Sequence, residues 1–295
     1  MRKKNWVLSI PPNEIERLLA STAPAIYRRV AIIVTEDGEV FSGVFVKCLG
    51  FEGILTAGHS ASSFMAQEQF RLVVSKLLHR FTVHSRDFEH VPIGRPYEPD
   101  KIDGDDLSFV IIRNENLLCS LRNLSQSVEF HDITKCNGTP QRILGEFHAG
   151  EVQPINWGVA GCPREKVDVK IESQQGERFK ASMVTVALIQ CNFDSYELRG
   201  KFDYITLLAG SGFEDFPSDY NGMSGGGIWY QQFFSENGHY RVEPILAGIV
   251  CWQYRPTQRK GYRIRKIQGH GFVSIYAQVR QTLYEEFVEN PRDNN

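Results

Sequence analysis

The sequence has no long apolar run and no excess of charge of either sign. No stretch approaches the roughly 18 apolar residues that a membrane-spanning helix requires, so we expect no membrane partner. Its 33 basic and 35 acidic residues leave a net charge of −2, which gives no global attraction to nucleic acid. The N-terminal apolar stretch from Trp6 stops at Pro11 and is too short for a secretory signal. We therefore predict a protein that stays in the cytoplasm.

Cysteine pairs and metal-ligand spacings are also missing. The six cysteines are scattered without a CxxC pair, at positions Cys48, Cys119, Cys136, Cys162, Cys191 and Cys251. Neither they nor the histidines show the spacing of a zinc site, so no metal and no cofactor is expected. Reduced and mostly buried thiols fit a reducing compartment. Six cysteines also allow a set of disulfides, which stays open as an alternative.

The sequence does contain a series of short β-branched and aromatic runs separated by turn residues. The first two runs flank Asp37-Gly38, a hairpin signal because a tight turn needs a positive φ at its centre. Further strands are predicted within residues 70–78, 80–84, 107–113, 167–173, 183–191, 204–210, 245–252 and 271–276. Repeated short strands of this kind predict β-barrels rather than a parallel sheet.

Two helices are predicted near the ends of the chain. Residues 13–20 carry apolar side chains on one helical face after an Asn13 cap, and Pro24 ends the pattern. Near the other end, apolar side chains recur at four-residue intervals, at Ile275, Val279, Leu283 and Phe287. The first helix is expected to precede the barrels, and core packing is the expected role of the second.

Three short motifs carry the side chains of an acyl-transfer site. Ser224 stands among glycines in NGMSGGGIW, and its hydroxyl needs a neighbouring base, for which His59 in ILTAGHS is the candidate. A carboxylate on the far imidazole nitrogen orients such a base. Asp106 in GDDLSFVII is assigned to it because an apolar strand follows, while Asp103 and Asp105 compete by proximity. The alternative is a Gly-rich turn with an ordinary serine.

The order of these motifs resembles that of the trypsin-like serine proteases, which have the chymotrypsin fold. His59, Asp106 and Ser224 are 47 and 118 residues apart, so they can meet only through tertiary folding. The segment Ala247–Trp252 resembles the strand that lines the substrate cleft in that family. The resemblance, strongest to stand-alone bacterial and intracellular members, implies an all-β fold of two six-stranded antiparallel β-barrels with short N- and C-terminal helices.

The resemblance also divides the chain into four parts. They are an N-terminal helical extension over 1–28, a first barrel over 29–140 carrying His59 and Asp106, a second barrel over 141–274 carrying Ser224, and a C-terminal helix and tail over 275–295. No Pro- or Ser-rich linker marks the change between barrels, which we place near residues 135–150. The active site is expected in the crevice between the barrels.

By the same resemblance, the residues around the nucleophile take defined roles. The backbone amides of Gly222 and Ser224 are expected to bind the oxyanion, because a side chain at position 222 would obstruct the turn. The substrate pocket maps to Ser218, Cys251, Trp252 and Gln253. Ser218 is not the acid that selects Arg or Lys, although the adjacent Asp219 could add negative charge. We expect a preference other than Arg or Lys, and Gln253 in place of glycine favours small or polar side chains.

Three further features complete the interpretation. Met223 stands where animal members of the family carry an aspartate that pairs with a newly cut N-terminus, so that activation switch is not expected. Residues 255–266 carry six basic side chains in twelve, which fits a solvated loop, recognition of acidic substrate residues or an acidic partner, or contact with nucleic acid. His270 either lines the pocket or has a structural role.

The leading hypothesis from the sequence is a serine endopeptidase that hydrolyses a protein or peptide substrate through an acyl-enzyme. Its catalytic residues are Ser224, His59 and Asp106, and it needs no cofactor. The alternative is a protease-fold interaction module with little basal activity, whose triad is ordered by an activating protein partner or a stress signal. Nucleic acid is not expected as a partner, because the overall charge is not basic.

Overall fold

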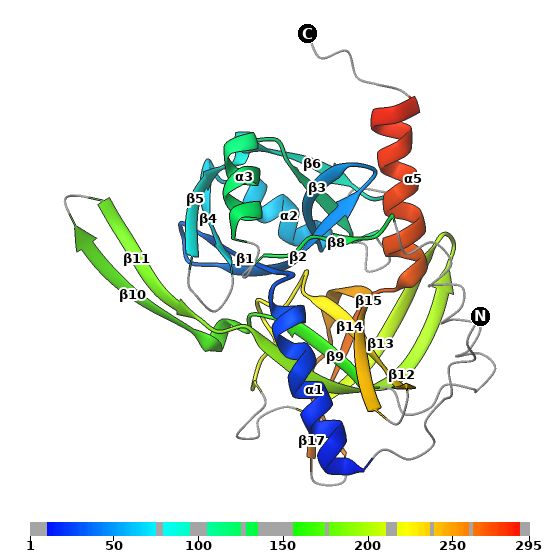
Figure 1. Ribbon diagram of the computed structural model, residues 1–295. Coiled ribbons are helices and arrows are strands. Elements are labelled where there is room, and N and C mark those ends of the chain that lie inside the picture. The colour runs from blue at the N-terminus through cyan, green and yellow to red at the C-terminus, as the bar shows by residue number, and fades with distance from the viewer. Residues whose placement is uncertain are drawn as a thin grey trace.

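The computed structural model describes residues 11–74, 79–94, 105–124, 128–134, 156–174, 177–210, 217–236, 239–259 and 262–289. In these ranges the chain forms two antiparallel β-barrels, one above the other in Figure 1, with helices at both ends of the chain. The predicted fold class is therefore confirmed. The predicted boundary between the barrels lies outside the described residues, and the four-part division of the chain stays a prediction.

The first barrel is a sheet of seven strand segments in the order β5-β4-β1-β2-β3-β7-β6. Their bounds are β1 (Val30–Thr35), β2 (Val40–Cys48), β3 (Phe51–Thr56), β4 (Gln69–Val74), β5 (His79–His84), β6 (Phe88–Pro92) and β7 (Ser108–Ile112). A single 3-10 turn, η1 (Ser85–Asp87), joins β5 to β6, so these two segments act as one bent strand that closes a six-stranded barrel. The predicted hairpin at Asp37-Gly38 is confirmed, with Gly38 at φ 86°.

The second barrel is a ring of six strands closed by the pairing of β13 with β17. Its strands are β9 (Asn156–Gly161), β12 (Ala187–Arg199), β13 (Phe202–Gly210), β14 (Gly227–Glu236), β15 (His239–Gln253) and β17 (Tyr262–His270), and β16 (Thr257–Arg259) is added to the outer edge of β17. In the first barrel, β8 (His131–Asp132) pairs with β2 in parallel. All other pairings in both sheets are antiparallel between described strands.

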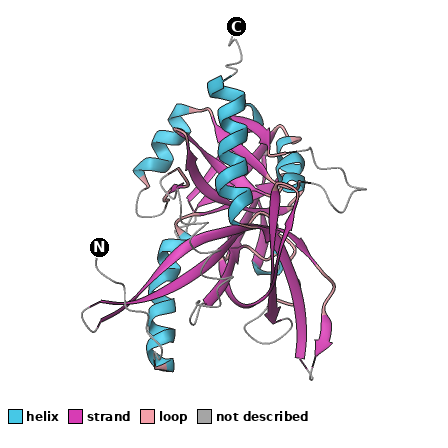
Figure 2. Cartoon of the chain, turned by 90° about the vertical axis from the view of Figure 1, so that its right-hand side faces the viewer, coloured by secondary structure: helices cyan, strands magenta, loops and turns pink. Residues whose placement is uncertain are grey.

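A two-stranded hairpin is inserted between β9 and β12. It consists of β10 (Val167–Gln174) and β11 (Glu177–Val184), which pair with each other over eight residue pairs. Figure 1 shows it extending away from the body of the molecule at the left of that view, and the turned view in Figure 2 shows that most of the chain is strand. It begins directly after the 3-10 turn η2 (Arg164–Lys166), which lies against the loop before Ser224.

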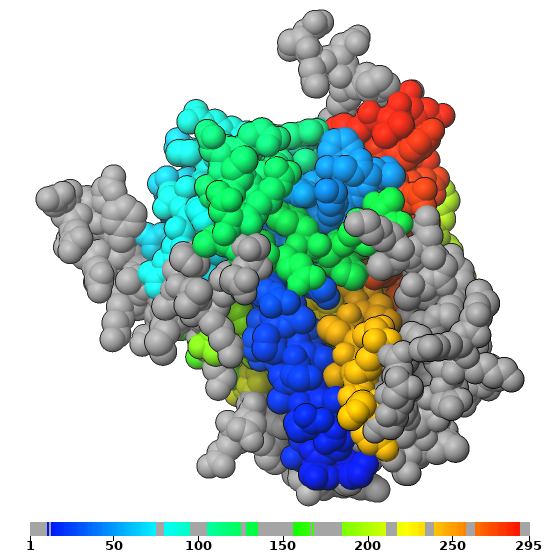
Figure 3. Space-filling model, viewed as in Figure 1, coloured from blue at the N-terminus to red at the C-terminus, as the bar shows by residue number. Residues whose placement is uncertain are grey.

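The N-terminal helix is longer than the sequence predicts. Helix α1 spans Pro12–Tyr27 with Pro24 inside it, and Pro11 rather than Asn13 occupies the N-cap. Pro24 is tolerated because the carbonyl that loses its donor belongs to the exposed Ala20, which water can reach, and because Ile26 is fully buried in the last turn. The apolar face of α1 packs on the second barrel, as Figure 3 shows from outside.

The predicted strand over 271–276 is wrong, because a helix begins there. The carboxylate of Asp203 accepts the backbone N–H groups of Val273 and Ser274, at 3.1 and 2.7 Å, and so satisfies donors at a helix start. The predicted C-terminal helix is confirmed in three consecutive segments, the π-helical η3 (Ser274–Gln278), α5 (Val279–Tyr284) and the π-helical η4 (Glu285–Glu289).

Two more helices cover the first barrel, α2 (Gly58–Met65) and α3 (Glu115–Asn123). None of the helices in the described ranges has the length and apolar content that a bilayer-spanning helix requires.

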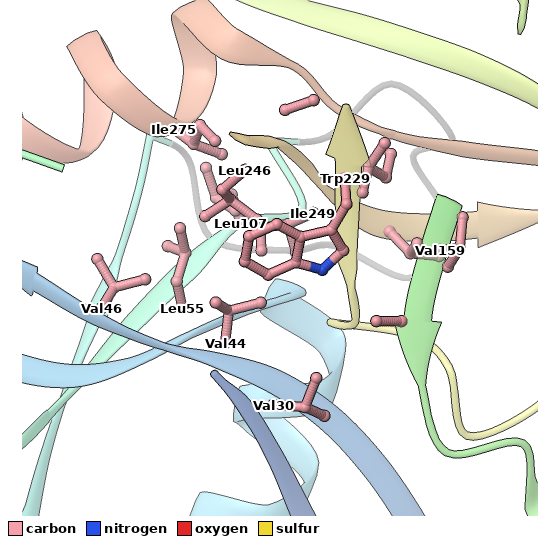
Figure 4. Packing of buried hydrophobic residues seen from close by; sticks show 14 of the residues in the cluster. Val30, Val44, Val46, Leu55, Leu107, Val159, Trp229, Leu246, Ile249 and Ile275 are labelled. Carbon is pink, nitrogen blue, oxygen red and sulfur yellow. The ribbon is translucent and has the colours of Figure 1, made fainter. Parts of the chain in front are cut away.

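One hydrophobic core runs through both barrels and fixes them against each other. Trp229 on β14 is fully buried between them, with Val44 and Leu55 of the first barrel on one side and Val159 of the second on the other (Figure 4). Because this core is continuous, residues of the two barrels that meet at its edge are held in a defined relative position.

Candidate active site

Strand register brings His59 and Asp106 together. In the antiparallel pair β3 and β7, Thr56 lies opposite Ser108, so the residues just after β3 and just before β7 share one end of the sheet. His59 lies in the first turn of α2, three residues beyond Thr56, and Asp106 precedes β7 by two residues. Gly58 leaves room for the carboxylate, since a Cβ there would lie 3.0 Å from Asp106 Oδ1.

Asp106 holds His59 through two hydrogen bonds. Its Oδ1 accepts the backbone N–H of His59 and its Oδ2 contacts His59 Nδ1, each at 2.7 Å. Asp106 is buried, at 6% exposure, whereas the His59 side chain is 28% exposed. This arrangement fixes the direction of the imidazole and leaves Nε2 for a third group.

That third group is Ser224. Its Oγ lies 2.7 Å from His59 Nε2, in the turn that precedes β14. The three residues predicted from the sequence thus form a continuous line of hydrogen bonds. Two of them belong to the first barrel and one to the second. Such a line can deprotonate a serine hydroxyl during attack on a carbonyl carbon.

Ser42, on β2 of the first barrel, fastens the turn that carries the nucleophile. Its Oγ donates to Gly222 O at 2.7 Å and accepts from Cys162 N at 2.9 Å, while its backbone N–H donates to Ser224 O at 3.1 Å. Sequence reasoning missed this residue, because a serine within an apolar strand carries no distinguishing pattern. Its position shows that the first barrel supports the serine turn as well as supplying the base.

The backbone at Gly222 requires glycine. Its φ is +89°, and a Cβ there would lie 2.6 Å from Cys162 O and 3.1 Å from Arg164 N. The backbone N–H groups of Gly222 and Ser224 donate to none of the described residues. Both residues line the cavity beside the serine.

A cavity of about 390 Å³ opens beside Ser224. Three of the four residues predicted for the substrate pocket line it, namely Cys251, Trp252 and Gln253. Ser218 is exposed, lies outside that lining, and donates both its N–H and its Oγ–H to the Glu165 carboxylate. The lining also includes Phe41 of the first barrel, so residues of both barrels border the cavity.

No protein-family model matches the sequence, and no curated protein is significantly similar to it. Solved structures with a similar fold include the following two. One is a variant of the HtrA-type protease AlgW with a tripeptide, at 14% identity and a TM-score of 0.44, covering 90% of this chain and 64% of that protein. The other is the thermostable serine protease AL20 from an extremophilic microorganism, at 12% identity and a TM-score of 0.38, covering 87% and 99%. Both scores lie below 0.5, so no role is transferred from either protein.

The remaining candidate residues lie around the site. The carboxylate of Asp105 lies close to Gly94, and Asp103 lies outside the described residues. Met223 is buried and belongs to the serine turn, with its N–H bonded to Tyr220 O at 3.0 Å. His270 is fully buried and does not line the cavity, and burial lowers its pKa to about 4.

The basic segment 255–266 is partly turned inward. Arg265, with a side chain only 11% exposed, donates to Gln253 Oε1 at 2.9 Å, and Lys266 pairs with Asp194 at 2.8 Å. Arg255 and Arg263 are exposed. Within the described ranges, no three His, Cys, Asp or Glu side chains come together as a metal site requires.

Proposed function

We propose that the protein is a serine endopeptidase that hydrolyses peptide bonds through an acyl-enzyme. The observation that carries the proposal is the line of hydrogen bonds from Asp106 through His59 to Ser224, beside a cavity. Both side-chain links are 2.7 Å long, and they join the atoms between which protons must move in acyl transfer.

In the proposed reaction, Ser224 Oγ attacks the substrate carbonyl carbon while His59 Nε2 takes the hydroxyl proton. His59 then gives that proton to the leaving amine, and the substrate acyl group remains as an ester on Ser224. A water molecule, deprotonated by the same nitrogen, hydrolyses the ester and restores the serine. Asp106 keeps the other imidazole proton on Nδ1 and stabilises the imidazolium formed in each step.

The negative charge on the attacked oxygen is assigned to the backbone amides of Gly222 and Ser224. Both line the cavity, and neither donates to another described residue. Amides already pointing at the developing oxyanion need no rearrangement during the reaction, and the loss of one such donor costs about 100- to 1,000-fold in kcat.

A peptide is the proposed substrate because an open strand edge borders the cavity. The pairing of β14 with β15 ends at Ile249, whereas β17 pairs with β15 as far as Gln253. The main chain of Val250 on that edge bonds to Gly225 and Gly226 of the serine turn. Residues 251–253 have one edge without a strand partner among the described residues, and they line the cavity. An extended peptide can bind such an edge through main-chain hydrogen bonds.

The test is hydrolysis of an unfolded protein such as casein by the wild type and two variants. Ser224→Ala should reduce turnover by about 10⁴- to 10⁶-fold and Asp106→Asn by about 10⁴-fold, while both variants keep the wild-type melting temperature. Casein hydrolysis that persists unchanged in folded Ser224→Ala protein would refute the assignment.

A further inference from the structure

We infer that the cavity beside Ser224 selects a small, uncharged side chain on the substrate residue whose carbonyl is attacked. This inference rests on the proposed function, since it places that residue next to Ser224 Oγ. It depends on three features of the cavity: an apolar inner wall, an acid that is already paired, and a side-chain bridge across the cavity.

The inner wall of the cavity is buried and mostly apolar. Tyr220, Val250 and Ile267 line it, with exposures of 2%, 4% and 1%. The Tyr220 hydroxyl donates to Gly210 O at 2.5 Å, so it cannot also donate to a substrate side chain. A charged side chain against this wall would lose its hydration without gaining a partner, which is strongly unfavourable.

The acid next to Ser218 is already paired. Asp219 accepts hydrogen bonds from Asn221 N and Asn221 Nδ2, at 3.0 and 2.6 Å, and lies 3.6 Å from Arg265 Nη1. Arg265 also donates to Ser218 O at 3.2 Å, so its guanidinium is fixed beside this acid. The positive and negative charges cancel locally, so Asp219 does not offer the unpaired carboxylate that a Lys or Arg side chain would need. Glu39 and Arg164 also line the cavity, but both are exposed and neither belongs to its buried inner wall.

Two side chains form a bridge at the cavity. Gln253, on β15, donates through Nε2 to Asn221 Oδ1 in the turn before Ser224, and both residues line the cavity. The other atom of the Gln253 amide is also bonded, because Oε1 accepts from Arg265 Nη1 at 2.9 Å. A long or aromatic substrate side chain must break this network to enter, whereas the side chain of alanine or valine need not.

The first test measures the cavity directly in the wild-type protein. Peptidyl diphenyl phosphonates that differ only in the side chain next to phosphorus react with an activated serine at rates that depend on the fit of that side chain. We expect the alanine and valine probes to inactivate the protein at least about tenfold faster than the phenylalanine, lysine and aspartate probes. A phenylalanine, lysine or aspartate probe that reacts as fast as the alanine probe would overturn the inference.

The second test removes the bridge. Gln253→Gly should raise the inactivation rate of the leucine and phenylalanine probes by about tenfold and change that of the alanine probe by less than about threefold. Gln281→Ala, an exposed glutamine on α5, is the matched control and should leave every rate unchanged. Unchanged rate ratios in folded Gln253→Gly protein would contradict the role of the bridge.

The two proposals fail in different ways. If the wild type reacts rapidly with all probes at similar rates, the selectivity is wrong and the endopeptidase proposal stands. If no probe reacts with folded wild-type protein, or if Ser224→Ala protein reacts equally well, the proposed function fails and the selectivity fails with it.

Discussion

The backbone N–H of Arg164 donates to the carbonyl oxygen of Asn221 over 2.6 Å. The peptide group that carries this carbonyl also carries the N–H of Gly222. Because a trans peptide is planar, its C=O and N–H point in opposite directions. The turn at Arg164 therefore sets the direction of one of the two amides proposed to bind the oxyanion.

Arg164→Pro removes this donor and keeps the rest of the turn. Pro163, at φ −61° and ψ 134°, already has the extended conformation required before a proline, and Arg164 is the first residue of η2, where proline is tolerated. We expect kcat to fall by about 100-fold with little change in KM, because the contact acts on the transition state rather than on bound substrate. Steady-state kinetics on one peptide substrate measure both constants.

Arg164→Ala is the control for that experiment, since it removes the side chain and keeps the N–H. Its kcat should stay within about threefold of the wild type. Equal kcat values for folded Arg164→Pro and Arg164→Ala proteins would show that the amide contact does not position the oxyanion site.

A pH-dependent loss of stability is expected from His270. This side chain packs between the rings of Phe202 and Tyr204, its ring nitrogens bond to none of the described residues, and burial lowers its pKa from 6.5 to about 4. Protonation therefore favours the unfolded chain. The contribution of the neutral His270 ring to the free energy of unfolding is fully present above about pH 6.5 and is lost as the pH falls towards 4.

Melting temperatures between pH 7.5 and pH 4.5 test this expectation. Over this pH range, the melting temperature of His270→Phe should fall less than that of the wild type, because the aromatic packing remains and the proton uptake is removed. His239→Gln, at an exposed histidine, should follow the wild-type curve. A wild-type slope that is unchanged in His270→Phe would show that another group controls the acid response.

Thiol reactivity should separate one cysteine from the others. Five of the six cysteines lie in the described ranges; all five are free, and among them only Cys119 is exposed. Burial raises the pKa of Cys48 to about 11 and those of Cys162 and Cys191 to about 12, so these thiols form little thiolate at pH 8. In a Cys136→Ser variant, Ellman's reagent should modify one thiol rapidly in the native protein and five after denaturation. Rapid modification of several thiols in the native state would contradict this burial.

The sequence predicted the parts of the site that lie in local patterns. His59, Asp106 and Ser224 stand in short motifs that can be recognised without knowledge of their spatial neighbours. The pattern of short strands was sufficient to predict the barrels. Ser42 and Arg164 were missed because they act through contacts with residues 180 and 57 positions away, which no local pattern records. The start of the C-terminal helix was missed because it depends on the distant carboxylate of Asp203.

A fluorophosphonate probe shows whether Ser224 is an activated nucleophile, because such probes react with activated serines whatever the substrate preference. Wild-type protein and Ser62→Ala, which changes an exposed serine on the same helix as His59, should both be labelled, and Ser224→Ala should not. Absence of labelling in folded wild-type protein, or equal labelling of Ser224→Ala, would contradict the account.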